Sequence, residues 1–147
     1  MVIPGEWLDC DDGVVRPVLL GFVGHADGSW SRVRFLLDTG ADRTVFTADV
    51  LDRSGLSPVG SRDQLDGLGG TSPSVQVATS IVLLTIDGTP VVFRGQYAAL
   101  TTVGALDMSV IGRDLLNEFV VIVDRPAGRV LLVGQNHSYQ IVDSPGS

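Results

Sequence analysis

The chain has one cysteine, Cys10, among its 147 residues. An internal disulfide is therefore excluded, and the composition fits a reducing compartment, so we expect a cytoplasmic location. Long apolar runs are also missing, because the longest, residues 81–86, is far too short to cross a bilayer. The N-terminal residues show no basic region followed by an apolar segment, so we expect no signal peptide and no membrane partner.

Positive charge is scarce as well. The sequence has 10 Lys and Arg residues against 17 Asp and Glu residues, a formal net charge of −7, and the basic residues form no cluster. We therefore expect neither nucleic acid nor an anionic membrane surface as a partner. The two histidines, His25 and His137, lie far from other ligand types in the sequence, so we expect no metal site and no cofactor.

What is present indicates one folded domain. Hydrophobic residues make up 44% of the sequence and charged residues 18%, and the length suits a single domain over residues 1–147. We expect its core within about residues 14–133, followed by a polar tail over 134–147. The pattern predicts a mostly-β chain with helices at 48–54 and 113–118. Strands are expected at 14–24, 30–37, 75–86, 91–100, 108–111, 119–123 and 129–133.

The most informative stretch covers residues 35–46, in which an apolar strand runs into Asp38-Thr39-Gly40. The strand delivers Asp38 to the tip of a loop, and Gly40 permits a tight turn beneath it. Apolar residues on both sides bury the ends of the loop, which makes Asp38 a candidate catalytic group. The alternative is an ordinary turn after a strand. A single carboxylate is also only half of an acid–base pair.

Two further motifs follow this stretch. Residues 65–73 are rich in glycine and predict a hairpin tip, although a mobile loop is the alternative. A phosphate-binding loop is disfavoured because the sequence has neither the P-loop lysine nor the helix that should follow. Residues 110–116 combine two apolar residues with Gly112, Arg113 and Asp114.

Together, in this order, the three motifs resemble those of the retroviral-type, or retropepsin-like, aspartic proteases, over about residues 14–133. The extended motif, Asp38 to Asp42, is far more specific than Asp-Thr-Gly alone. The chain departs from the viral enzymes in having Arg43 where an acidic residue is frequent, and in an inserted helix after residue 46. It is therefore more similar to the cellular and bacterial members.

The resemblance implies a single-lobed β-barrel with two short helices that works as a homodimer. Each subunit would supply one Asp38, and the two carboxylates would share a proton and activate a water at the dyad. Thr39 would hydrogen-bond across the dyad, and Gly40 would leave room for the substrate backbone. Asp42 would bind that backbone and form a structural ion pair with Arg113.

The remaining substrate-binding residues are also implied by the resemblance. Ala41 and Arg43 would contact the peptide, and a hairpin formed by Gly67, Leu68, Gly69 and Gly70 would close over it as a flap. Arg43 would favour an acidic substrate side chain, unless it turns back onto Asp42 or outward to solvent.

The function expected is therefore that of an aspartic endopeptidase acting on a peptide or protein substrate. The alternative is a non-catalytic dimeric peptide-binding module with the same fold. A terminal strand, either residues 138–142 or the N-terminal Val2 and Ile3, is expected to help form the dimer interface.

Overall fold

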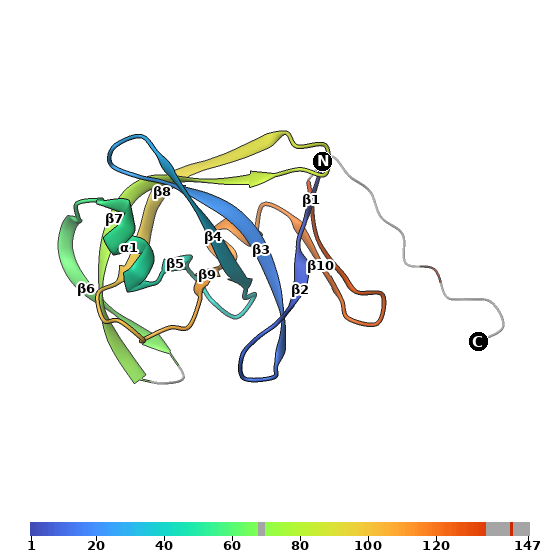
Figure 1. Ribbon diagram of the computed structural model, residues 1–147, viewed down its shortest axis with the longest axis horizontal. Helices are drawn as coiled ribbons and strands as arrows, with labels where there is room; N and C mark the ends of the chain where they lie inside the picture. Colours follow the sequence, from blue (N-terminus) through green and yellow to red (C-terminus); the bar gives the residue numbers. More distant parts are fainter. Residues whose placement is uncertain (68–69, 135–141, 143–147) are drawn as a thin grey trace.

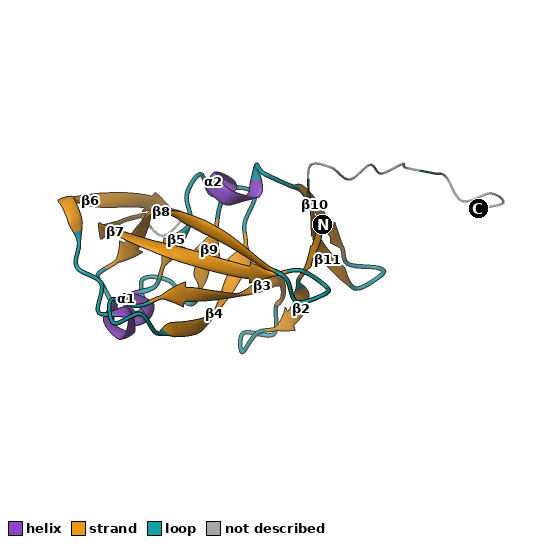
Figure 2. Cartoon of the chain, turned by 90° about the horizontal axis from the view of Figure 1, so that it is seen from above, coloured by secondary structure: helices purple, strands orange, loops and turns teal. Residues whose placement is uncertain are grey.

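A computed structural model of the chain describes residues 1–67, 70–134 and 142. Strands dominate this part of the chain, and two short helices, α1 (Ala48–Ser54) and α2 (Arg113–Leu116), accompany them. In Figure 2 the helices lie on opposite sides of the strands. The mostly-β architecture expected from the sequence is confirmed.

The larger of two sheets closes on itself (Figure 1). Its eight strands lie in the order β2 (Glu6–Asp9), β3 (Val15–Gly24), β4 (Trp30–Leu37), β9 (Ser109–Ile111), β5 (Val45–Phe46), β8 (Pro90–Leu100), β7 (Gly70–Leu84) and β6 (Val59–Gly67). An additional antiparallel pairing joins β3 to β7, with Gly21 opposite Leu83. The six strands from β3 round to β7 therefore form a closed barrel, flanked by β2 and β6.

The β3–β4 hairpin follows the alternation of its sequence. In β4, Val33, Phe35 and Leu37 are buried, whereas Arg32 and Arg34 face outward. Because successive strand residues point to opposite faces, this pattern places one face of β4 in the core and leaves the other free. The predicted hairpin is confirmed.

The barrel core lies beneath the loop that follows β4. Phe46 packs between two aromatic rings, with centroids 6.2 Å from Phe35 and 5.7 Å from Tyr97. Phe35 and Phe46 are essentially inaccessible to solvent, so both ends of the loop that carries Asp38 are buried in the same core. Burial of such large side chains stabilises the fold by about 2 kcal/mol or more each.

Helix α1 forms where the sequence predicts it. The Thr47 hydroxyl accepts a hydrogen bond from the backbone N–H of Val50, at 3.4 Å, and so caps the first turn. Gly55 ends the helix in the left-handed conformation, with φ of 65°, which glycine adopts without the steric cost of a Cβ.

A second, three-stranded sheet contains both ends of the described chain, in the order β1 (Val2–Pro4), β11 (Arg129–Val133) and β10 (Val120–Asp124). Val2 lies opposite Val133, and Ile3 is only 1% exposed within the main hydrophobic core. The core therefore begins before residue 14, the limit expected from the sequence. A three-residue strand has little local signal, and its partner is distant in the sequence.

Several boundaries differ from those expected. Strand β7 starts at Gly70 rather than at residue 75, because it pairs with β6, which was not predicted. This pairing includes Gly67 opposite Gly70, so tertiary pairing overrides the weak strand propensity of glycine. Residues 68 and 69, part of the hairpin tip expected from the sequence, lie outside the described residues. Helix α2 ends at Leu116 rather than at residue 118, and the backbone N–H of the next residue, Asn117, still donates to the carbonyl of Arg113.

Neither helix in the described part of the chain has the length and apolar character needed to cross a membrane.

Candidate active site

Asp38 directly follows strand β4 and continues its pairing. Strand β4 runs parallel to β9, with Leu37 opposite Ile111, and the backbone N–H of Asp38 donates to the carbonyl of Ile111 at 3.1 Å. The aspartate is therefore held in the direction of the strand, at the edge of the core, with its side chain partly exposed.

The loop turns tightly just after Asp38. Its Oδ1 accepts a hydrogen bond from the backbone N–H of Gly40 at 2.9 Å, and its carbonyl accepts one from Ala41 at 3.2 Å. A Cβ at position 40 would lie 3.2 Å from the Asp38 carboxylate, which is a tight contact. The glycine therefore lets the backbone approach the carboxylate, while Thr39 and Gly40 remain exposed.

The start of helix α2 anchors the other side of this loop. The backbone N–H of Arg113 donates to Ala41 at 2.8 Å, and that of Asp114 donates to Asp42 at 3.2 Å. The Arg113 guanidinium also forms an ion pair with Asp42 and donates from Nη1 to the carbonyl of Thr39 at 2.8 Å. One arginine thus connects both halves of the loop, a geometry that the planar guanidinium fork suits.

Asp114 anchors the end of the loop through Thr44, a contact that the sequence analysis missed. The backbone N–H and the hydroxyl of Thr44 donate to the Asp114 carboxylate at 3.0 and 2.7 Å. Thr44 is fully buried, and its hydroxyl oxygen accepts a hydrogen bond from the N–H of Gly112 at 3.2 Å. The sequence feature that could have indicated this contact is the aspartate directly after Arg113, in the first turn of a short helix. Only Arg113 was assigned a role from the sequence.

Gly112 lets α2 approach the loop at close range. A Cβ at this position would lie 2.5 Å from the carbonyl oxygen of Arg43 and 2.9 Å from that of Ala41. Both contacts are with backbone atoms, so no side chain can move aside to make room. Only glycine fits this position without displacing the loop that carries Asp38.

Three carboxylates therefore lie on or beside the loop, and two of them already have a partner in an ion pair or in side-chain hydrogen bonds. Asp42 pairs with Arg113, and Asp114 accepts hydrogen bonds from Thr44. Among the residues described, Asp38 has no cationic partner. Asp38 is thus the carboxylate of this loop that remains free for chemistry.

Among the described residues, no hydrogen bond or ion pair joins Asp38 to the other residues expected in the site. Arg43 is exposed and, within residues 1–67, 70–134 and 142, forms no ion pair. Gly67 and Gly70 pair with each other in the β6–β7 hairpin, while Leu68 and Gly69 lie outside the described residues. The contacts above therefore bring together Thr39, Ala41, Asp42 and Arg113 around Asp38.

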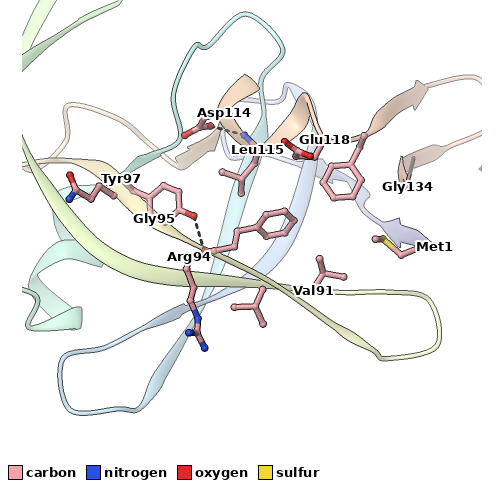
Figure 3. A pocket seen from close by; sticks show the side chains of 13 residues that line it. Met1, Val91, Arg94, Gly95, Tyr97, Asp114, Leu115, Glu118 and Gly134 are labelled. Carbon is pink, nitrogen blue, oxygen red and sulfur yellow. Dashed lines mark hydrogen bonds between the residues drawn. The ribbon is translucent and has the colours of Figure 1, made fainter. Parts of the chain in front are cut away.

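A cavity of about 780 Å³ lies beside α2 (Figure 3). Tyr97, Asp114 and Phe119 border it, and its described lining contains no residue of the 38–43 loop. The Tyr97 hydroxyl donates to the carbonyl of Phe93 at 2.8 Å. Burial, assisted by the charge of Asp114, raises the pKa of Tyr97 to about 12. Tyr97 therefore stays neutral near pH 7 and is no candidate base.

Within the described part of the chain, no three His, Cys, Asp or Glu side chains lie close enough together to hold a metal ion. The site therefore combines one carboxylate without a cationic partner in the described chain, a tight glycine turn and a loop held by α2.

The chain is similar in fold to several solved proteases. A retropepsin-like aspartic protease from Rickettsia conorii aligns over 90% of this chain and 97% of its own, with 18% identity and a TM-score of 0.56. The retroviral protease-like domain of Ddi1 from Leishmania major covers 81% of this chain and 96% of its own, at 14% identity and a TM-score of 0.44. The EIAV protease, solved with the inhibitor HBY-793, covers 69% and 86%, at 22% identity and a TM-score of 0.45.

Comparison with curated proteins finds no significant match. The model of a protein family described as aspartyl protease, however, matches residues 24–115. This range is more than half of the chain and contains Asp38, Thr44, Gly112 and Asp114. The chain therefore has a retropepsin-like fold and belongs to the aspartyl protease family.

Proposed function

We propose that this protein is an aspartic endopeptidase whose active site forms when two copies bring their Asp38 side chains together. The observation that carries the proposal is that Asp38 has no cationic partner among the described residues, whereas the other acidic groups at its loop, Asp42 and Asp114, are paired. One carboxylate cannot serve as base and acid at once, and the chain has a single Asp-Thr-Gly. A second copy supplies the missing group.

In the proposed mechanism, the two Asp38 carboxylates share one proton, because two charges so close together cannot both be stable. The unprotonated carboxylate takes a proton from a bound water, which attacks the scissile carbonyl. The protonated carboxyl polarises that carbonyl and donates to its oxygen. Thr39 would join the two loops across the dyad, and Gly40 would leave space for the substrate backbone.

Substrate binding is assigned to the rest of the loop and to the hairpin. Ala41, Asp42 and Arg43 would contact an extended peptide, and the β6–β7 hairpin would close over it as a flap. The ion pair between Asp42 and Arg113 supports this arrangement, because it fixes the loop without using Asp38. From the single cysteine we also propose that the protein acts in a reducing, cytoplasmic compartment.

The strand that forms the dimer interface is also a proposal. Val2–Pro4 is paired with β11 of its own chain, and the N–H of Ile86 donates to the carbonyl of Val2 at 3.0 Å. The N-terminal strand thus has partners within the subunit, which favours residues 138–142. Of these, only Val142 is described, and it is 74% exposed.

The function is tested by incubating the protein with an unstructured protein substrate between about pH 3 and pH 7, with and without a transition-state-mimicking aspartic protease inhibitor. We expect cleavage that is fastest below neutral pH and abolished by the inhibitor. Specific activity should fall on dilution, as the dimer separates. Inhibitor-sensitive peptide binding without cleavage would indicate the non-catalytic module instead.

A further inference from the structure

A groove borders the outer face of β4 on the way to Asp38. It has a volume of about 640 Å³ and lies between the β2–β3 turn and the segment just before β9. Leu36, Met108 and Val110 contribute an apolar floor, whereas Asp9, Asp11 and Asp107 stand at its rim. The groove therefore combines an apolar surface with an acidic edge.

The groove and the Asp38 carboxylate share one face of the strand. Leu36 precedes Asp38 by two positions, and the parallel pairing of Leu36 with Val110 continues through the bond from the Asp38 N–H to Ile111. Residues two apart in a strand point to the same side. A peptide bound at Asp38 can therefore place a nearby side chain in this groove.

Four aspartates line the groove, Asp9, Asp11, Asp12 and Asp107, and they outnumber the two arginines there, Arg16 and Arg34. Arg16 is occupied by Asp12, at 2.6 Å, and Arg34 lies 3.9 Å from Glu6. Asp9, Asp11 and Asp107 are exposed and have no ion-pair partner in the stretches that the structure describes. Three negative charges thus surround an apolar floor, a combination that complements a long side chain with a cationic end.

Building on the proposed endopeptidase function, we propose that this groove selects substrates with a lysine or arginine side chain at one position near the scissile bond. The methylene stem packs on Leu36, Met108 and Val110, and the charged end lies among Asp9, Asp11 and Asp107. This preference is separate from any effect of Arg43, which lies on the other side of the catalytic turn in the sequence.

Matched peptides test the proposal. One cleavable sequence is varied to Lys, Gln or Glu at each position flanking the cleaved bond, and kcat/KM is measured at about pH 6, where exposed carboxylates are ionised. At one position we expect Lys to exceed Gln by about fivefold, with Glu slower than Gln. The Lys-to-Gln ratio should fall toward one in Asp11→Asn and Asp107→Asn, and further in the double variant. It should also fall at high salt.

Asp52→Asn provides the matched control, because Asp52 is an exposed carboxylate on α1, outside the groove. This variant loses the same charge and should keep the wild-type ratio. An equal fall in Asp52→Asn, or no preference for Lys at any position, would overturn the proposal, because the groove would then play no specific part.

Binding separates this proposal from the catalytic one. The dissociation constants of the same peptides for the Asp38→Asn protein are measured by fluorescence anisotropy. Lys-selective binding by the Asp38→Asn protein, together with no cleavage of these peptides by the wild-type protein, would support the groove and reject the endopeptidase. Cleavage without charge selectivity, in rate or in binding, would do the reverse.

Discussion

The loop that carries Asp38 and the turn at residues 10–14 both lead out of the barrel, but they are held in opposite ways. Arg113 and Asp114, about 70 residues further along the chain, anchor the loop that carries Asp38. The turn closes on itself: the N–H of Cys10 donates to Val14 at 3.0 Å, and Asp12 binds Arg16. The geometry of Asp38 therefore depends on tertiary contacts, whereas the groove rim can vary without disturbing it.

The largest expected effect is on catalysis. Asp38→Asn keeps the shape of the side chain but removes the base, so turnover should fall by about a thousandfold or more. The urea midpoint should barely change, because Asp38 has no ion pair to lose among the described residues. Retention of near-wild-type cleavage would show that the catalytic group lies elsewhere.

The next test introduces one methyl group behind the loop that carries Asp38. In Gly112→Ala, the added Cβ would lie 2.5 Å from the carbonyl of Arg43, so we expect a loss of about 3 kcal/mol in stability, together with lower activity. Gly95→Ala is the control, because its Cβ would approach Tyr97 no closer than 3.5 Å. Equal urea denaturation curves for the two variants would contradict the tight packing of α2 against the loop.

The two loops can be compared directly through their aspartates. Asp114→Ala leaves the buried donors of Thr44 without their acceptor, and should cost about 2 kcal/mol of unfolding free energy. Asp12→Ala removes contacts that are exposed and local, so its effect on the urea midpoint should be clearly smaller. If Asp12→Ala lowers the urea midpoint as much as Asp114→Ala, the contacts of the turn at 10–14 are not merely local.

The smallest expected effect depends on pH. Hydrogen bonding to Arg16 lowers the pKa of Asp12 from its ordinary value of 3.8 to about 2. A depressed pKa means that the contact stabilises the fold above about pH 4 and is lost as the pH falls toward 2. The difference in urea midpoint between wild type and Asp12→Asn should therefore be present at about pH 6 and disappear near pH 2. A difference that grows as the pH falls would contradict the lowered pKa of Asp12 in the folded protein.

Features with local causes could be predicted from the sequence. The β3–β4 hairpin follows from alternation and a glycine turn, and α1 follows from Thr47 and Gly55, which cap its two ends. The Asp-Thr-Gly motif likewise identified Asp38 as the candidate acid, because a strand that runs into a glycine turn has a short-range signature.

Features that depend on distant partners could not be predicted from the sequence. Asp114 and Thr44 are 70 positions apart, and neither shows by itself that it will bind the other. Strand β6 was missed because its pairing with β7 outweighs its own weak preference. The acidic groove was missed for the same reason, since residues 9–11 and Asp107 meet only when the barrel closes.

The pairing of β1 with β11 also constrains the order in which the chain can fold. Val2 and Val133 are joined in one of the most non-local contacts of the molecule, and the Asp38 loop likewise needs residues 111–114. Chain closure over such separations slows folding, to milliseconds or longer in β-rich domains. Because synthesis proceeds from the N-terminus, β1 is made long before its partner β11. The loop that carries Asp38 is thus completed only after α2 has been made, so the nascent chain lacks the anchored geometry of Asp38 until that point.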